Sequence, residues 1–168
     1  MAEASNEPYR PLTVDVDRWA GAASTGITKQ LFEILDIVDA NGPLRRALTD
    51  PSRSAEDRAR LVHTLFDGRA NDVAVDIVAE LASQRSATER QLGDGIERTA
   101  VQLAAAAAEN RGGVDALEAL VDELIGFKSM LERSAELQRA FSDARASAEA
   151  KVTLARRLMA PGSEEAAL

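Results

Sequence analysis

The residues best suited to chemistry in this sequence are one histidine, His63, two neighbouring acids, Asp15 and Asp17, and a Gly-Asp-Gly stretch at residues 93–95. A histidine acts as a general base only beside a group that positions it, and the sequence around His63 supplies none. A divalent cation needs several converging oxygen ligands, more than two acids on one short stretch provide. The Gly-Asp-Gly stretch lacks the spacing and the preceding strand of a nucleotide-binding loop. We therefore interpret His63 as an exposed helix residue, the acids as helix N-terminal charges, and the glycines as a bend.

The composition narrows the classes of function further. The 168 residues include no cysteine, which excludes disulfides, thiolate zinc sites and thiol nucleophiles. The net charge of −8, with no cluster of Lys and Arg, argues against nucleic acid and favours a neutral or basic protein partner. No apolar stretch is long enough to span a bilayer, and the first residues do not resemble a signal peptide. We predict a cytoplasmic protein that is not an enzyme, with no catalytic residue, metal or cofactor and no direct membrane insertion.

The fold class follows from the kinds of apolar residue present. Hydrophobic residues make up 45 % of the chain, which is enough to bury a core, while aromatic residues make up only 4 %. Alanine dominates this apolar fraction, and runs of β-branched residues are few. Alanine has the highest helix propensity, so the composition predicts an all-α fold of closely packed helices.

Two stretches of the chain share one pattern at a constant offset: residues 44–66, the first copy, and residues 137–159, the second copy. Each reads as a short helix, a turn containing Asp50 or Asp143, and a second helix with Ser54 or Ser147 as its N-cap. Recurrence of turn and cap residues as well as apolar spacing favours duplication over coincidence. The second copy has alanine where the first has Pro51, the residue expected to stop the short helix. The identical positions are Leu44, Arg46, Ala47, Asp50, Ser54, Ala55, Glu56, Leu61 and Leu65, and in the second copy Leu137, Arg139, Ala140, Asp143, Ser147, Ala148, Glu149, Leu154 and Leu158.

Helical spacing continues on both sides of the first copy. Apolar residues recur every three or four positions within residues 14–23, 27–38, 73–81, 92–108 and 114–133. The expected interruptions are Gly21 or Gly26, the Asn-Gly-Pro sequence at 41–43, an N-cap at Ser86 and the glycines at 112–113.

These elements predict three parts: a flexible lead over residues 1–12, a first helical bundle over 13–97, and a second, incomplete bundle over 98–168. After Pro161 and Gly162, the last six residues read as the start of another helix that is cut short.

Several of these stretches resemble the δ subunit of F-type ATP synthase, called the oligomycin-sensitivity-conferring protein in mitochondria. Residues 98–107 (RTAVQLAAAA), a glycine turn and residues 114–120 (VDALEAL) resemble the opening of its helical bundle. Residues 44–48 (LRRAL), Asp50-Pro51 and residues 54–62 (SAEDRARLV) resemble the family's short helix, turn and next helix. The doubled arrangement looks like the longer δ subunits of some bacteria. The sequence departs from the family at Thr99, where an aromatic is usual, and by lacking the last helices of the second bundle and the C-terminal domain.

The resemblance implies a scaffold: a peripheral-stalk subunit that joins the stalk to the catalytic head, at the inner face of the plasma membrane. Its implied partners are the α subunit, whose amphipathic N-terminal helix lies between the first and fifth helices of the family's bundle, and the b subunit of the stalk. The residues this implies for partner binding are Val16, Trp19 and Ala20 with Val73, Ile77 and Leu81 in the first bundle, and Val101, Ala104, Ala105 and Ala108 in the second.

Some interpretations stay open at this stage. A helical-repeat adaptor or regulator that binds peptides is the alternative function. Trp19 is either core or contact, and the alanines at 104–108 either pack in a core or line a groove. Glu33, Asp36 and Asp39 are interpreted as a solvated face. The incomplete bundle is expected to expose apolar surface within residues 117–127 and to self-associate or be partly disordered there.

Overall fold

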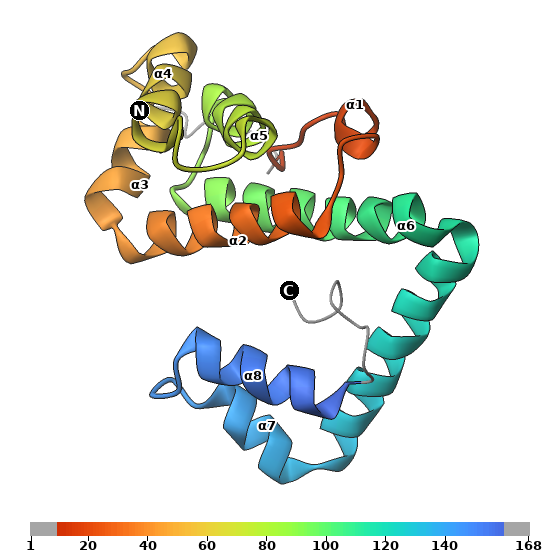
Figure 1. Ribbon diagram of the computed structural model, residues 1–168. Helices are drawn as coiled ribbons and strands as arrows, with labels where there is room; N and C mark the ends of the chain where they lie inside the picture. The colour runs from red at the N-terminus through yellow and green to blue at the C-terminus, as the bar shows by residue number, and fades with distance from the viewer. Residues whose placement is uncertain (1–9, 160–168) are drawn as a thin grey trace. The chain divides into compact units, whose positions relative to one another are not determined.

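The computed structural model of the protein describes residues 10–159, and in that range it contains eight α-helices and no strand (Figure 1). The all-α prediction is therefore confirmed. The chain divides into two compact units: unit 1 comprises Met1–Val16 and Gln30–Ala100, and unit 2 comprises Asp17–Lys29 and Val101–Leu168. The helices are α1 (Val16–Ala20), α2 (Thr25–Ala40), α3 (Gly42–Thr49), α4 (Ala55–Phe66), α5 (Asp72–Ser83), α6 (Arg90–Arg133), α7 (Ala135–Ser142) and α8 (Ala148–Leu158).

The core of unit 1 is organised around α5, which packs along α4 (Figure 1). Seven of the twelve residues of α5 are buried, so this helix is covered on more than one side. The large side chains that are fully buried in unit 1 include Leu31, Leu48, Val62, Ile77, Leu81, Leu92 and Ile96. A helix buried to this extent needs neighbours on several sides, and α4 covers one side of α5.

Side-chain caps set the starts of three helices in unit 1. Asn41 caps α3, Ser54 caps α4 and Asn71 caps α5, each by accepting a hydrogen bond from a backbone N–H in the first turn. The prediction for Ser54 is confirmed. The interruption predicted at residues 41–43 is confirmed: α2 ends at Ala40, and Pro43 lies in the first turn of α3. The side chain of Asn41 also caps the start of α3, which was not predicted.

The start of α6 differs from two predictions. The helix begins at Arg90, so Ser86 lies in the preceding loop and does not cap it. The bend expected at residues 93–95 is also absent, because the only non-helical backbone angles inside α6 are at Gly112 and Gly113. Both glycines of that stretch instead allow close packing: a Cβ on Gly93 would lie 3.3 Å from Asp39 Oδ1, and one on Gly95 would lie 3.3 Å from Leu81 Cδ2.

Unit 2 contains the kink of α6 and the two short helices that follow it (Figure 1). The predicted stop at 112–113 is confirmed, since Gly113 has φ of 67°, a value that favours glycine. Ser134 caps α7, and Ser147 caps α8 as predicted. Within the described residues 121–159, every side chain is at least partly exposed.

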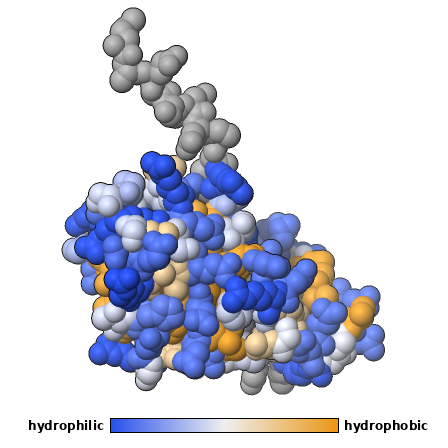
Figure 2. All heavy atoms as spheres, turned by 90° about the horizontal axis from the view of Figure 1, so that it is seen from above, coloured by the Kyte–Doolittle hydropathy of each residue, from blue (hydrophilic) through white to orange (hydrophobic). Residues whose placement is uncertain are grey.

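The N-terminal part of unit 2 contains most of α1 and the first turn of α2. The chain leaves helical geometry after Ala20, so Gly21 rather than Gly26 marks the break, and Ser24 accepts a hydrogen bond from the Ile27 N–H at 3.3 Å. The short helix expected after Gly162 lies outside the described residues. Figure 2 shows one face of the molecule, on which hydrophilic residues predominate and hydrophobic ones occur in small groups.

Candidate functional site

The residues of α5 expected to meet a partner helix lie mostly in the core of unit 1. Ile77 and Leu81 have no exposed surface, and Val73 is half-buried. Of the three, Val73 alone offers surface to another molecule in the described arrangement. The partner-binding role of this helix stays a prediction.

A buried arginine holds the C-terminal end of α5. Arg58, on α4, is only 5 % exposed, and its guanidinium donates to five backbone carbonyl oxygens. A helix C-terminus has unpaired carbonyls and a partial negative charge. A guanidinium there donates hydrogen bonds to those carbonyls and offsets the charge. This contact was not predicted, and its one sequence signal is that Arg58 is four residues before the buried Val62, on the same helical face. The acceptors are Ala82 (2.7 Å), Ser83 (2.9 Å), Gln84 (3.3 Å), Asp50 (3.2 Å) and Arg53 (2.6 Å).

The predicted residues of α1 are divided between the units, with Val16 half-buried in unit 1 and the others in unit 2. Trp19 is 9 % exposed, and its Nε1–H is buried without a hydrogen-bond partner. The guanidinium carbon of Arg18 lies 4.5 Å from the centroid of the Trp19 ring, which is a cation–π distance. Asn110 of α6 donates to the carbonyls of Ala20 at 2.8 Å and Ala23 at 3.2 Å. Trp19 therefore lies on a turn that α6 anchors, with its ring largely covered.

The predicted residues of α6 face two ways. Val101 is 58 % exposed and Ala105 is half-buried, whereas Ala104 and Ala108 are buried. Val101 and Ala105 are four residues apart and so lie on one face, where small side chains let another helix approach closely. Of the two interpretations, core packing therefore describes Ala104 and Ala108, which are buried. Val101 and Ala105 have accessible surface, as a groove would require.

A second row of exposed apolar side chains lies on α6 after the kink. Val114 is 61 % exposed, Val121 47 %, Leu124 44 % and Ile125 57 %. Their spacing of seven, ten and eleven residues places them along one side of the helix. This row includes the expected exposure within residues 117–127, and the self-association expected from it stays a prediction.

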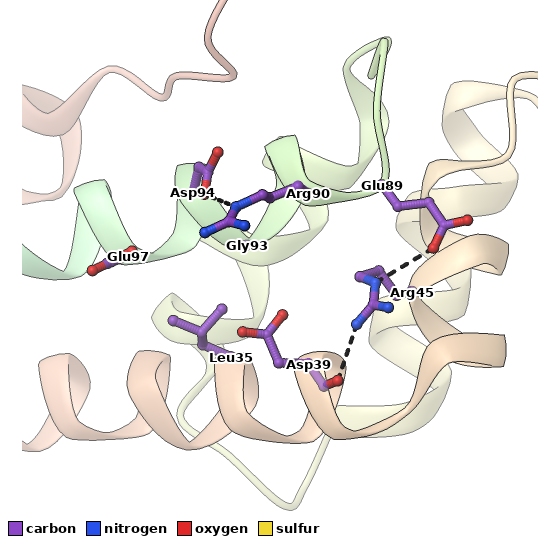
Figure 3. A pocket seen from close by; sticks show the side chains of 8 residues that line it. All are labelled: Leu35, Asp39, Arg45, Glu89, Arg90, Gly93, Asp94 and Glu97. Carbon is purple, nitrogen blue, oxygen red and sulfur yellow. Dashed lines mark hydrogen bonds and ion pairs between the residues drawn. The ribbon is translucent and has the colours of Figure 1, made fainter. Parts of the chain in front are cut away.

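Unit 1 has a hollow of charged residues that sequence reasoning did not predict (Figure 3). Its volume is about 450 Å³, and Arg45 crosses it, with Nε 3.4 Å from Glu89 Oε2 and Nη1 donating to the Asp39 carbonyl at 3.0 Å. Arg90 and Asp94 form a second pair at 3.6 Å on the surface of α6. Two solvent-accessible ion pairs thus account for four of the charged side chains that line the hollow, and we interpret it as a charged surface.

His63, the one histidine of the sequence, lies next to two aspartates. Its Nδ1 lies 3.0 Å from Oδ1 of Asp67, the residue that follows α4, and its Nε2 lies 3.9 Å from Asp76 Oδ1 on α5. Its side chain is 39 % exposed. Among residues 10–159, no group of three or more histidines and acids is arranged to hold a metal ion.

The turn aspartate of each copy has a pKa below its ordinary value. Hydrogen bonds from the Ser52 hydroxyl and backbone N–H lower the pKa of Asp50. Hydrogen bonds from the Arg145 side chain and backbone N–H lower the pKa of Asp143 in the same way. These carboxylates accept hydrogen bonds within their own turns, and their side chains are 39 % and 37 % exposed, so we interpret them as groups that stabilise the turns.

Comparison with known proteins shows which proteins this chain resembles. The chain is 84 % identical over 168 residues to the ATP synthase subunit delta of Kocuria rhizophila, covering all of this chain and 62 % of that protein. It is 41 % identical over 171 residues to the subunit of the same name from Arthrobacter sp. (strain FB24), and 38 % identical over 168 residues to that of Renibacterium salmoninarum. These two alignments each cover 99 % of this chain and 62 % of the relative. No protein-family model matches the chain.

The chain thus spans about three fifths of the length of these relatives. Within the part of the chain that the structure describes, no helix combines the length and the apolar character required to cross a bilayer.

Proposed function

This chain belongs to the δ-subunit family of ATP synthases over the part of those proteins that it spans, and we propose that it serves as a non-catalytic subunit of the peripheral stalk of an F-type ATP synthase. The observation that carries this proposal is the 84 % identity over the whole chain. In this role the protein joins the stalk to the catalytic head and resists the torque of the rotor. Its partners are the α subunit and the stalk's b subunit, and it acts at the inner face of the plasma membrane without entering the bilayer.

The proposed contact with the head is a helix-in-groove interaction with the amphipathic N-terminal helix of an α subunit. The face of α6 that bears Val101 and Ala105 suits it, because one exposed valine lies beside a small residue that allows close approach. The alternative surface lies in unit 1, where Val73 on α5 and Val16 at the start of α1 are half-buried. Apart from the half-buried Ala20, the other residues implied for partner binding are buried and take no direct part in these surfaces: they are Trp19, Ile77, Leu81, Ala104 and Ala108.

Isothermal titration calorimetry with a synthetic N-terminal segment of the α subunit from the same organism tests the proposal. Two variants locate the surface: Val101→Asp for α6 and Val73→Asp for α5. We expect saturable binding to the wild-type chain and at least a tenfold loss in one of the two variants, because a buried carboxylate in a helix interface is costly. Gln102→Asp is the matched control, since it adds the same charge one residue from Val101 at an exposed position.

The outcome that contradicts the proposal is an absence of binding at peptide concentrations of about 1 mM, a free energy weaker than about −4 kcal/mol. Equal losses in Val101→Asp and Gln102→Asp would show that general charge repulsion, and not a specific groove, governs binding. Binding of unrelated amphipathic helices with the same affinity would favour a peptide-binding adaptor over a stalk subunit.

A further inference from the structure

Residues 10–13, here called the strap, contact other parts of unit 1 through backbone hydrogen bonds and through the buried side chain of Leu12. The strap has no regular secondary structure, and its residues belong to the same unit as α5 and the start of α6. It includes the end of the stretch that the sequence predicts to be a flexible lead, and Leu12 within it is only 3 % exposed. Such burial in an irregular segment calls for an explanation of what recognises it.

Gln84, the residue that follows α5, hydrogen-bonds both polar backbone groups of one residue of the strap. Its Nε2 donates to the Thr13 carbonyl at 2.7 Å, and its Oε1 accepts from the Thr13 N–H at 3.2 Å. A single amide thus pairs with both polar backbone groups of one residue, as a neighbouring strand does in a sheet. The pairing requires that the N–H and the C=O of one residue point to the same side, as they do in an extended chain. It does not involve the side chain of Thr13.

One face of α6 hydrogen-bonds two other carbonyl groups of the strap. Gln91 donates to the Arg10 carbonyl at 3.2 Å, and Arg98 donates to the Leu12 carbonyl at 3.3 Å. Gly95, between them on the same face, gives the strap room, because a Cβ there would lie 3.3 Å from Leu12 Cβ and 3.4 Å from the Leu12 carbonyl oxygen. The positions i, i+4 and i+7 of a helix therefore form a shallow track for an extended chain.

Gln91 is fixed in place by contacts of its own. It is 2 % exposed, and its Oε1 accepts from the backbone N–H groups of Ala87 and Thr88 in the loop before α6. With that oxygen engaged, the Nε2 of the same amide points to the strap. A buried amide oriented by the scaffold is preorganised, which lowers the entropy lost when a peptide binds.

The chemistry of the track defines its ligand. It binds three carbonyls and one N–H of an extended segment, and it buries one side chain, Leu12. Pro11 is exposed and has no N–H that would need a partner, and its fixed φ favours the extended form. A cavity of about 710 Å³ borders the strap on the side of residues 84–87, so the strap is not enclosed.

We propose that Gln84, Gln91, Gly95 and Arg98 form a binding site for an extended Pro-Leu-Thr segment, and that the strap is a detachable occupant that a partner peptide of the same chemistry replaces. The inference rests on the geometry of unit 1 alone and does not depend on the stalk function proposed above. The site selects an extended backbone with a leucine-sized side chain at the position of Leu12.

The test uses the full chain with its strap displaced by Leu12→Asp and a fluorescent peptide of residues 7–15 added in trans. Fluorescence anisotropy is expected to give a Kd at least tenfold lower for Leu12→Asp than for the wild-type chain. The tethered strap of the wild type has a high effective concentration and competes with the peptide. In the wild type, excess unlabelled peptide is expected to speed hydrogen exchange of the chain's own Thr13 amide.

Matched variants separate the site from general stickiness. Leu12→Asp combined with Gln84→Ala is expected to lose the peptide, whereas Leu12→Asp combined with Gln102→Ala, an exposed glutamine, is expected to keep it. A peptide that carries Asp in place of Leu is expected not to bind. If circular dichroism shows that Leu12→Asp is unfolded, Leu12→Ala takes its place. Equal affinity for the wild-type and strap-displaced chains, or no binding at about 1 mM, overturns the proposal.

Discussion

The two copies of the repeated pattern have nearly the same backbone and very different surroundings. In the first, Ser54 Oγ accepts from the Asp57 N–H at 3.0 Å, and in the second, Ser147 Oγ accepts from the Ala150 N–H at 3.2 Å. The aspartate that ends the short helix has φ and ψ of −63° and 115° in the first copy and −66° and 113° in the second. Pro51 is therefore not required for this turn, since the second copy makes it with alanine. The recurrence of the geometry supports the duplication that we infer from the sequence.

The difference lies in what covers the second helix of each copy. In the first copy, Val62 and Leu48 are fully buried and α5 packs on α4. In the second copy, the corresponding Ala155 and Phe141 are partly exposed. Arg58 is buried against carbonyls, while Lys151 at the matching position is half-buried. Local sequence thus specifies the helix, turn and cap, whereas burial depends on a neighbouring helix that only the first copy has within the described residues.

The largest expected effect is at the arginine that distinguishes the copies. Arg58→Ala is expected to lower the free energy of unfolding of unit 1 by about 3 kcal/mol, because up to five carbonyls lose their donor in a buried site. Lys151→Ala at the matching position is expected to cost less than about 0.5 kcal/mol. Urea unfolding followed by amide NMR signals of each unit measures both. Similar losses for the two variants would contradict the idea that only the first copy is locked.

Glycines sharpen the contrast between packed and open surroundings. A Cβ on Gly95 would meet Leu12 and Leu81 at 3.3 Å, so Gly95→Ala is expected to destabilise unit 1 by about 1–2 kcal/mol. A Cβ on Gly126, in the helix before the second copy, would meet nothing within 4 Å. Gly126→Ala is expected to stabilise α6 by about 0.5–1 kcal/mol. Thermal unfolding monitored by circular dichroism gives the sign of each change, and a stabilising Gly95→Ala would show that its neighbours can yield.

Much of this fold was predictable because helix starts and stops are local. Ser54, Ser147 and the glycines at 112–113 act as their types and positions suggest. The failures are non-local: a Gly-Asp-Gly stretch reads as a bend until Leu12 and Asp39 are seen to pack against it. The contacts of Arg58 and of the strap likewise join residues distant in sequence, so no spacing rule reveals them. Of the candidate partner residues, the sequence indicated apolar helical faces but not which members are buried.

The caps are expected to behave alike in the two copies. Ser54→Ala and Ser147→Ala each remove one side-chain acceptor at a helix start and are expected to cost about 1 kcal/mol. Hydrogen exchange of the Asp57 and Ala150 amides reports each loss at its own helix. Markedly different effects at these two amides would break the equivalence of the copies.

The smallest expected effect is the pH dependence of the two turns. Hydrogen bonding depresses the folded-state pKa of Asp50 and Asp143 below the ordinary value of 3.8, so each turn is stabilised above that value, and this contribution is lost as pH falls through the lower folded pKa. Ser52→Ala is expected to raise the pKa of Asp50 and to leave that of Asp143 unchanged. Arg145→Ala is expected to raise the pKa of Asp143 and to leave that of Asp50 unchanged. NMR titration of the carboxyl carbons measures both values. A crossed effect, in which one variant shifts both pKa values, would contradict independent turns.

The most direct test of the account is a two-dimensional amide NMR titration of the chain with an N-terminal segment of the α subunit from the same organism. We expect saturable shifts confined to one surface, either α5 around Val73 or the face of α6 around Val101 and Ala105. A second set of shifts at Val114, Val121 and Ile125 would extend that surface past the kink. No shifts at about 1 mM peptide, or shifts scattered over both units, would contradict the proposal that this chain is a stalk subunit that binds the catalytic head.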